Sequence, residues 1–197
     1  MSFGLRPFSE ADFVAALPEH LRAADEVHFT PAWVIELVAE WLSGLELSSV
    51  LDIGSGVGKF CVLSALKLPD LQFVGVERRL ELHSVAQGFQ RDWPELKLEF
   101  ILADVLDLDL SAYKVLYMYN PFYEHVADEA ALNQEFELYE SAFEQYQNAL
   151  RKRLQALPLG TIVIAYHGEQ NELPYTYELH KQSPDGLLKM WIKKWIV

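Results

Sequence analysis

The chain has 197 residues, of which 51% are hydrophobic and 23% are charged, and this balance excludes a wholly disordered or fibrous protein. At this length we expect a single domain, residues 1–197, with a large hydrophobic core. The net charge of −13 disfavours binding to duplex nucleic acid and to anionic membranes, since both of these surfaces are negatively charged.

The residue types also exclude some kinds of site. The chain has one cysteine, Cys61, which rules out an intramolecular disulfide and a multi-cysteine zinc site, and we expect it to be a small buried side chain. The spacing of the six histidines predicts no metal site. The chain begins without the apolar core of a signal peptide, and no run approaches the roughly 18 apolar residues that cross a bilayer, so we expect a cytoplasmic protein.

Two helices are predicted ahead of the main part of the domain. We expect a helical extension at residues 1–45 and a core at residues 46–197. Ser9 opens a short helix, which Pro18 ends. The second helix begins with Thr30 as its cap and carries its apolar residues on one face.

In the core, strand and helix patterns alternate with short connections, which predicts an α/β fold. The predicted strands are Val50–Ile53, Gln72–Val76, Leu96–Leu102, Lys114–Tyr119, Thr161–Tyr166, Tyr175–Lys181 and Leu187–Ile196. A Ser-Pro-Asp-Gly turn separates the last two strands and predicts a C-terminal antiparallel hairpin. We therefore expect a mostly parallel sheet with helices on both faces.

Helices are predicted between these strands at residues 59–68 and 82–93. A long stripe of apolar residues, at alternating spacings of four and three, predicts a further helix over residues 132–154. Such a stripe suits packing on the chain's own sheet, which we favour, or a seam in a homodimer or with a protein partner.

A glycine-rich loop follows the first core strand and opens the next helix, in the run Asp52-Ile53-Gly54-Ser55-Gly56-Val57-Gly58. Glycines let the backbone turn sharply and approach a ligand closely. A dinucleotide fold would need a glycine at position 59, where Lys59 stands, and a phosphate-binding loop would need a hydroxyl where Phe60 stands. The loop therefore predicts a ligand of another kind, bound beyond the carboxyl ends of the strands.

The acidic-x-Gly-x-Gly-x-Gly spacing resembles that of the class I S-adenosylmethionine-dependent methyltransferases, and the resemblance covers about residues 29–166. It implies a Rossmann-like fold and S-adenosylmethionine as the cofactor. It also implies a carboxylate at three successive strand ends, with Asp52 toward the cationic methionine end, Glu77 toward the ribose hydroxyls and Asp104 toward the adenine amino group. The same family pattern places further residues beside the cofactor: Gly54, Ser55, Gly56, Gly58 and Val105.

Three carboxylates suit that cofactor, because it carries a sulfonium and an ammonium but no phosphate. Each carboxylate taken alone would also suit a helix cap or a solvent-facing position. Their placement at three successive strand ends, beside the glycine loop, favours the cofactor interpretation.

The fourth core strand runs into Asn120-Pro121-Phe122-Tyr123, which resembles the [DN]-P-P-[YFW] motif of amino-group methyltransferases. The resemblance implies catalytic roles for Asn120 and Pro121, whose oxygens accept hydrogen bonds from the target nitrogen, and for Tyr123, which stacks on a planar substrate. Asn120 would border the cofactor as well. Phe122 replaces the second proline of the motif, and a simple turn after the strand is the alternative.

Two weaker features lie near the same strand ends. The segment around Thr30 is similar to an aromatic-Thr-Pro segment that touches the cofactor carboxylate in many adenine-specific methyltransferases, although a helix cap explains the same residues. Glu124, His125 and His167 fall at or just past strand ends, where a general base could lie, although a histidine there more often belongs to the scaffold.

These observations favour transfer of a methyl group from S-adenosylmethionine to a nitrogen of a protein side chain or a small molecule. The glycine loop is also similar to that of the non-SET histone lysine methyltransferases. The alternatives are an oxygen-directed small-molecule methyltransferase and a non-catalytic cofactor-binding subunit of a methyltransferase complex. A nicotinamide-dependent oxidoreductase is a distant third, because of Lys59.

Overall fold

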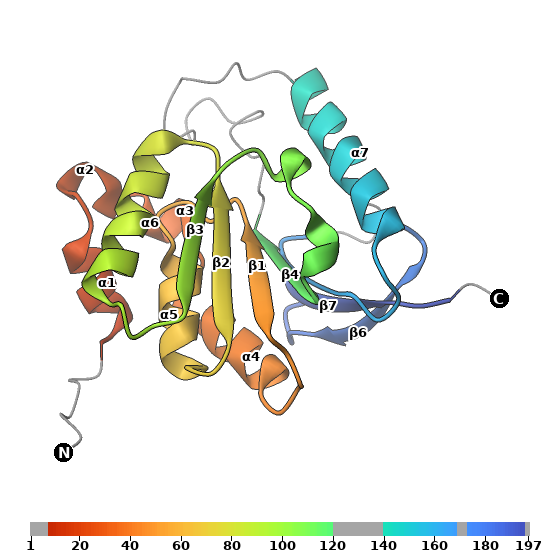
Figure 1. Ribbon diagram of the computed structural model, residues 1–197, viewed down its shortest axis with the longest axis horizontal. Helices are drawn as coiled ribbons and strands as arrows, with labels where there is room; N and C mark the ends of the chain where they lie inside the picture. The colour runs from red at the N-terminus through yellow and green to blue at the C-terminus, as the bar shows by residue number, and fades with distance from the viewer. Residues whose placement is uncertain (1–7, 120–139, 169–172, 196–197) are drawn as a thin grey trace.

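The computed structural model describes residues 8–119, 140–168 and 173–195, and within them seven strands form one sheet (Figure 1). The strand order across the sheet is β3-β2-β1-β4-β5-β7-β6. The strands are β1 (Ser49–Ile53), β2 (Gln72–Glu77), β3 (Leu98–Leu102), β4 (Val115–Tyr119), β5 (Ile162–Tyr166), β6 (Tyr177–Gln182) and β7 (Leu188–Lys193).

Strands β1 to β5 run parallel to one another, and β7 runs antiparallel to both of its neighbours, β5 and β6. The predicted fold, a mostly parallel sheet with a C-terminal antiparallel hairpin, is confirmed. The strand order reverses between β1 and β4, and in open α/β sheets ligands bind beyond the carboxyl ends of the strands at such a point.

Two predicted strands, β3 and β6, start two residues later than predicted because turns use the residues before them. The N–H of Leu96 donates to the carbonyl of Trp93, so β3 begins later than predicted, at Leu98. The N–H of Tyr177 donates to the carbonyl of Pro174, so β6 begins at Tyr177 rather than at Tyr175. In both places a local hydrogen bond holds the backbone out of the sheet.

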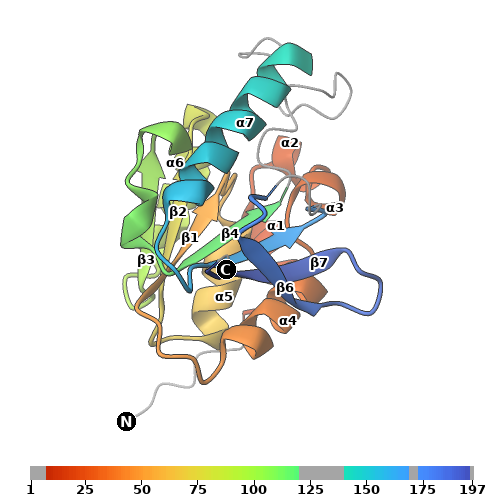
Figure 2. The same ribbon diagram turned by 90° about the vertical axis from the view of Figure 1, so that its right-hand side faces the viewer.

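Helices cover both faces of the sheet (Figures 1 and 2). The helices are α1 (Glu10–Ala16), α2 (Glu19–Arg22), α3 (Asp25–His28), α4 (Ala32–Leu42), α5 (Lys59–Lys67), α6 (Leu80–Asp92) and α7 (Glu140–Ala156). Successive strand residues alternate between two cores: Val50 belongs to the core that residues of α1, α2, α4, α5 and α6 share, and Leu51 belongs to the core that α7 shares. Asp52 therefore lies on the α5 side of the sheet.

The N-terminal helices share the larger core with the sheet. Phe13 and Leu21 are buried in it, and a capping box between Ser9 and Asp12 fixes the start of α1. The prediction that Thr30 caps the next helix is wrong, because the helix begins at Ala32 and its cap position is occupied by a proline. The Thr30 hydroxyl instead pairs with a buried tyrosine hydroxyl, a partner that only the folded chain supplies.

Helix α7 packs on the second face of the sheet. Leu150 and Leu154 from the predicted apolar stripe are buried in the smaller core, as expected for a helix on its own sheet. The first part of the stripe, residues 132–139, lies outside the described residues. In the part of the chain that the structure describes, no helix has the length and hydropathy that a membrane span requires.

Candidate functional site

The glycine loop connects β1 to α5 at the point where the strand order reverses. Gly54, Gly56 and Gly58 have φ angles of 74°, 55° and 82°, a left-handed conformation that residues with a side chain rarely adopt. The N–H groups of Gly54 and Ser55 donate to the carbonyl of Val76 at 2.9 and 3.0 Å. The spacing of one glycine at every second position is therefore a backbone requirement of this turn.

Asp52 lies in β1 beneath this loop and is only 4% exposed. Its Oδ2 atom accepts a hydrogen bond from the Cys61 thiol of α5 at 3.5 Å. Burial raises the pKa of Asp52 to about 8, so the carboxyl group is mostly protonated at neutral pH. Cys61 is buried as expected, and burial raises the pKa of its thiol well above the usual range, so it is unsuited to act as a nucleophile.

Glu77 ends β2 and is 3% exposed. Within the described residues its carboxylate accepts five hydrogen bonds. Oε1 accepts from the N–H groups of Arg78 and Arg79, both at 2.9 Å, and from Nε of Arg79 at 3.1 Å. Oε2 accepts from the N–H of Gly56 at 3.0 Å and from Nη2 of Arg79 at 3.3 Å. Glu77 thus ties the glycine loop to the start of α6.

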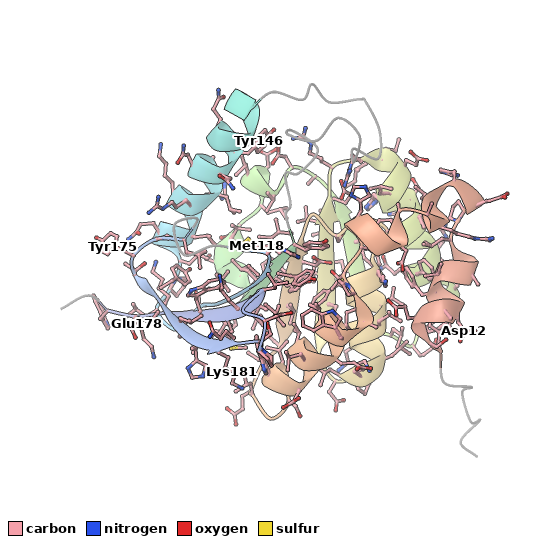
Figure 3. The ribbon with its side chains drawn as sticks, turned by 180° about the vertical axis from the view of Figure 1, so that it is seen from behind. Asp12, Met118, Tyr146, Tyr175, Glu178 and Lys181 are labelled. Atoms are coloured by element: carbon pink, nitrogen blue, oxygen red, sulfur yellow. The ribbon has the colours of Figure 1, made fainter. Side chains whose placement is uncertain are left out.

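Asp104 follows β3, and its carboxylate meets a side chain of α7. Oδ1 accepts from the N–H of Leu106 at 2.9 Å, and Oδ2 accepts from the Tyr146 hydroxyl at 3.0 Å. Tyr146, which α7 carries (Figure 3), also accepts a hydrogen bond from the Arg78 guanidinium at 2.8 Å. The structure thus links the ends of β2 and β3 to α7. Val105, next to Asp104, is buried.

Thr30 and its neighbour Phe29 bring the N-terminal extension against the glycine loop. The Thr30 hydroxyl lies 3.0 Å from the hydroxyl of Tyr117 in β4, and both residues are buried. A side chain added at Gly56 would begin 3.8 Å from the Phe29 ring. The extension therefore covers the loop from the α4 side.

Aromatic rings gather at the carboxyl ends of β4 and β5. Tyr166 contacts Trp33 of α4, Tyr119 and His167, with ring centroids 5.5, 4.8 and 4.3 Å away. Trp33 is 40% exposed. His167 has a φ of 61°, a strained conformation for a residue with a side chain, and such strain is concentrated at functional sites.

Sequence reasoning named only some of these groups. It singled out His167 but not the rings around it, which come from three separate elements. It also missed Arg79 and Tyr146. The run Glu-Arg-Arg at the end of β2 was the available signal for Arg79, since a carboxylate followed directly by two arginines has nearby donors. For Tyr146 the sequence held no signal beyond its place in the apolar stripe.

Several predicted site residues lie outside the described residues: Asn120, Pro121, Tyr123, Glu124 and His125. They follow Tyr119, the last residue of β4, directly in the chain. Over residues 8–119, 140–168 and 173–195, no group of three His, Cys, Asp or Glu side chains is arranged to hold a metal ion.

Solved structures resemble this chain in fold at low sequence identity. The RNA methyltransferase of Salinibacter ruber, solved with S-adenosylhomocysteine, is 18% identical with a TM-score of 0.60, over 85% of this chain and 95% of that chain. The fold is that of the S-adenosylmethionine-dependent methyltransferases. The protein yhhF of Escherichia coli is 12% identical with a TM-score of 0.57, over 85% and 89% of the two chains. TrmN of Thermus thermophilus is 17% identical with a TM-score of 0.57, over 81% and 48%.

No protein-family profile matches the chain, and no curated protein matches it in sequence. The methyltransferase fold agrees with the resemblance carried by the glycine loop. It also gives the three carboxylates a common setting, since all three stand at or just after the carboxyl ends of neighbouring strands.

Proposed function

We propose that this protein transfers a methyl group from S-adenosylmethionine to a nitrogen nucleophile on a protein side chain or a small molecule. The observation that carries the proposal is the set of three carboxylates, Asp52, Glu77 and Asp104, at the ends of β1, β2 and β3 around a left-handed glycine loop. Within a methyltransferase fold, this arrangement suits a ligand with two cationic groups and no phosphate.

In this proposal each carboxylate holds one part of the cofactor. Asp52 faces the methionine ammonium, and a cation beside it would favour the ionised form that burial disfavours. Glu77 accepts hydrogen bonds from the ribose hydroxyls, and Asp104 accepts one from the adenine amino group. When bound, S-adenosylmethionine supplies an electrophilic methyl group on its sulfonium.

The acceptor side of the proposal rests on the segment that begins at Asn120. Asn120 and the Pro121 carbonyl hold the target nitrogen through two hydrogen bonds, which orients its lone pair toward the methyl group. Tyr123 offers a stacking surface, and Trp33, which is 40% exposed and packs against the buried Tyr166 at the end of β5, offers a second one. His167, beside Tyr166, is the candidate acceptor of the proton that the nitrogen releases.

Calorimetry with the purified protein tests the cofactor. We expect binding of S-adenosylhomocysteine and S-adenosylmethionine and no binding of NAD. Gly56→Ala is expected to remove this binding, because it puts a side chain into the loop. Gly44→Ala is the matched control, since Gly44 is also left-handed, with a φ of 79°, and has nothing near its added carbon. Binding of NAD without a response to S-adenosylhomocysteine would overturn the proposal.

Methyl transfer is tested separately, by incubating the protein with cell extract and methyl-labelled S-adenosylmethionine. We expect label in protein or in small molecules, on a nitrogen that mass spectrometry of the labelled product identifies. Label on oxygen would replace the nitrogen assignment with an oxygen-directed enzyme. If the protein binds the cofactor but transfers no methyl group on its own, and it co-purifies with a stoichiometric partner, a non-catalytic subunit is favoured instead.

A further inference from the structure

A buried lysine connects the N-terminal helices to the end of the glycine loop. Lys59 is the first residue of α5 and is only 2% exposed. Its Nζ atom lies 2.7 Å from Oε1 of Glu10 in α1 and 2.7 Å from Oδ1 of Asp25 in α3. We call these three residues the acidic clamp. The lysine stands where a dinucleotide loop has glycine, and nothing in the proposed chemistry uses it.

The position of the clamp matters because of the charge at the start of α5. The N-terminus of a helix carries a partial positive charge and ordinarily attracts anions such as phosphates. Lys59 by itself would add a full positive charge there, directly after Gly58, the loop glycine at the cap position of α5. Glu10 and Asp25 reverse the sign, because the three clamp side chains together carry a charge of −1.

We propose that the acidic clamp determines which charge the glycine loop accepts. Glu10 and Asp25 make this end of the site negative, so that it favours a cationic ligand and disfavours a ligand with phosphates. The inference rests on the proposed function, since it explains how the loop would select S-adenosylmethionine. It assigns the N-terminal helices a part in cofactor specificity in addition to their part in the core.

The clamp could instead be purely structural, a buried ion pair that holds α1 and α3 in place. The two roles differ in what they do to two ligands of nearly the same shape. S-adenosylmethionine carries a positive sulfonium, whereas S-adenosylhomocysteine has a neutral sulfur at the same place. If the clamp is only structural, its loss loosens the loop and lowers the affinity for both ligands by the same factor. If the clamp sets the local charge, its loss changes the ratio of the two affinities.

A surface ion pair on the same helix supplies the matched control. Lys67, the last residue of α5, lies 3.4 Å from Glu36 of α4, and both side chains are exposed. Lys67 is about 12 Å from the start of α5 at 1.5 Å per residue. Glu36→Gln therefore removes one negative charge from the protein, as Glu10→Gln does, but it breaks an ion pair of Lys67 and leaves the two ion pairs of Lys59 in place.

The experiment measures the dissociation constants of both ligands by calorimetry for the wild type, Glu10→Gln, Asp25→Asn, the double variant and Glu36→Gln. The double variant removes both carboxylate charges beside Lys59, so the local charge becomes more positive. We therefore expect the affinity for S-adenosylmethionine to fall about threefold to tenfold relative to that for S-adenosylhomocysteine, an effect that salt reduces. Glu36→Gln should leave the ratio within about 1.5-fold of wild type.

Glu10→Gln guards against a double variant that fails to fold, because the Glu10 side chain is 38% exposed and the change keeps its shape. We expect a smaller shift of the ratio in the same direction. Equal loss of affinity for both ligands, or an unchanged ratio, would overturn the role of the clamp and leave the proposed function intact. A wild-type protein that binds neither ligand would overturn the proposed function itself.

Discussion

Replacing Arg79 with methionine tests whether the Arg79 guanidinium must leave Glu77 before the ribose hydroxyls of the proposed cofactor can bind there. The Arg79 side chain donates two of the hydrogen bonds that the Glu77 carboxylate accepts, at 3.1 and 3.3 Å. The three backbone donors are closer, at 2.9 to 3.0 Å. A carboxylate offers about four acceptor positions, so ribose hydroxyls can reach Glu77 only if the guanidinium gives way.

The size of the effect follows from what the guanidinium loses when it moves. Arg79 is 12% exposed and Glu77 is 3% exposed, so their pairing lies between a surface ion pair and a buried one. Separating them should cost about 1–2 kcal/mol. Arg79→Met removes this cost, and we expect S-adenosylhomocysteine to bind about fivefold to thirtyfold more tightly. Glu77→Ala should weaken binding about tenfold to a hundredfold, since it removes the acceptor itself.

Calorimetric titration of both variants checks these values. Arg91→Met is the control, because Arg91 is an exposed arginine in the last turn of α6, the helix whose N-cap position Arg79 occupies. Weaker binding by Arg79→Met would refute the reasoning and show that Arg79 holds Glu77 in its binding position. An unchanged dissociation constant for Glu77→Ala would mean that Glu77 only anchors the loop and the start of α6.

Three further expectations concern other parts of the site. The pKa of Asp52 is raised to about 8, so the folded protein keeps a proton that the unfolded chain releases above about pH 4. The contribution of Asp52 to the free energy of unfolding therefore falls by up to about 1.4 kcal/mol per pH unit from pH 4 to 8. Asp52→Asn should remove that slope in urea unfolding measured from pH 5 to 8, and an unaltered slope would contradict it. His167→Gly should raise the free energy of unfolding by up to about 1 kcal/mol, because it relieves a left-handed φ, whereas His180→Gly, in strand β6, should lower it. Asn120→Ala should leave S-adenosylhomocysteine affinity within about twofold and reduce labelled methyl transfer roughly a hundredfold, and full activity would make Asn120 a turn residue.

The parts of the fold that the sequence predicted are those that depend on local chemistry. The glycine spacing required a left-handed turn at Gly54, Gly56 and Gly58, and the alternation of strands and helices gave the parallel sheet. Partner choice between distant segments could not be predicted in this way. Thr30 had a local explanation as a helix cap, but the buried hydroxyl of Tyr117, which comes from β4, became its partner.

The same limit explains why the proposed cofactor carboxylates were predicted without their partners. Asp104 has its donor in a distant helix, the Tyr146 hydroxyl of α7, and Asp52 has the Cys61 thiol of α5, whereas the Arg79 guanidinium that donates to Glu77 lies only two residues along the chain. Buried or half-buried carboxylates need such donors, because an unpaired one is costly. Binding of a ligand at these groups would therefore exchange hydrogen bonds, and its affinity would be a difference between two sets of contacts. Arg78 connects these groups, because its N–H donates to Glu77 and its guanidinium donates to the Tyr146 hydroxyl. Variants at Arg79, which also donates to Glu77, and at Tyr146 should therefore have non-additive effects on ligand affinity.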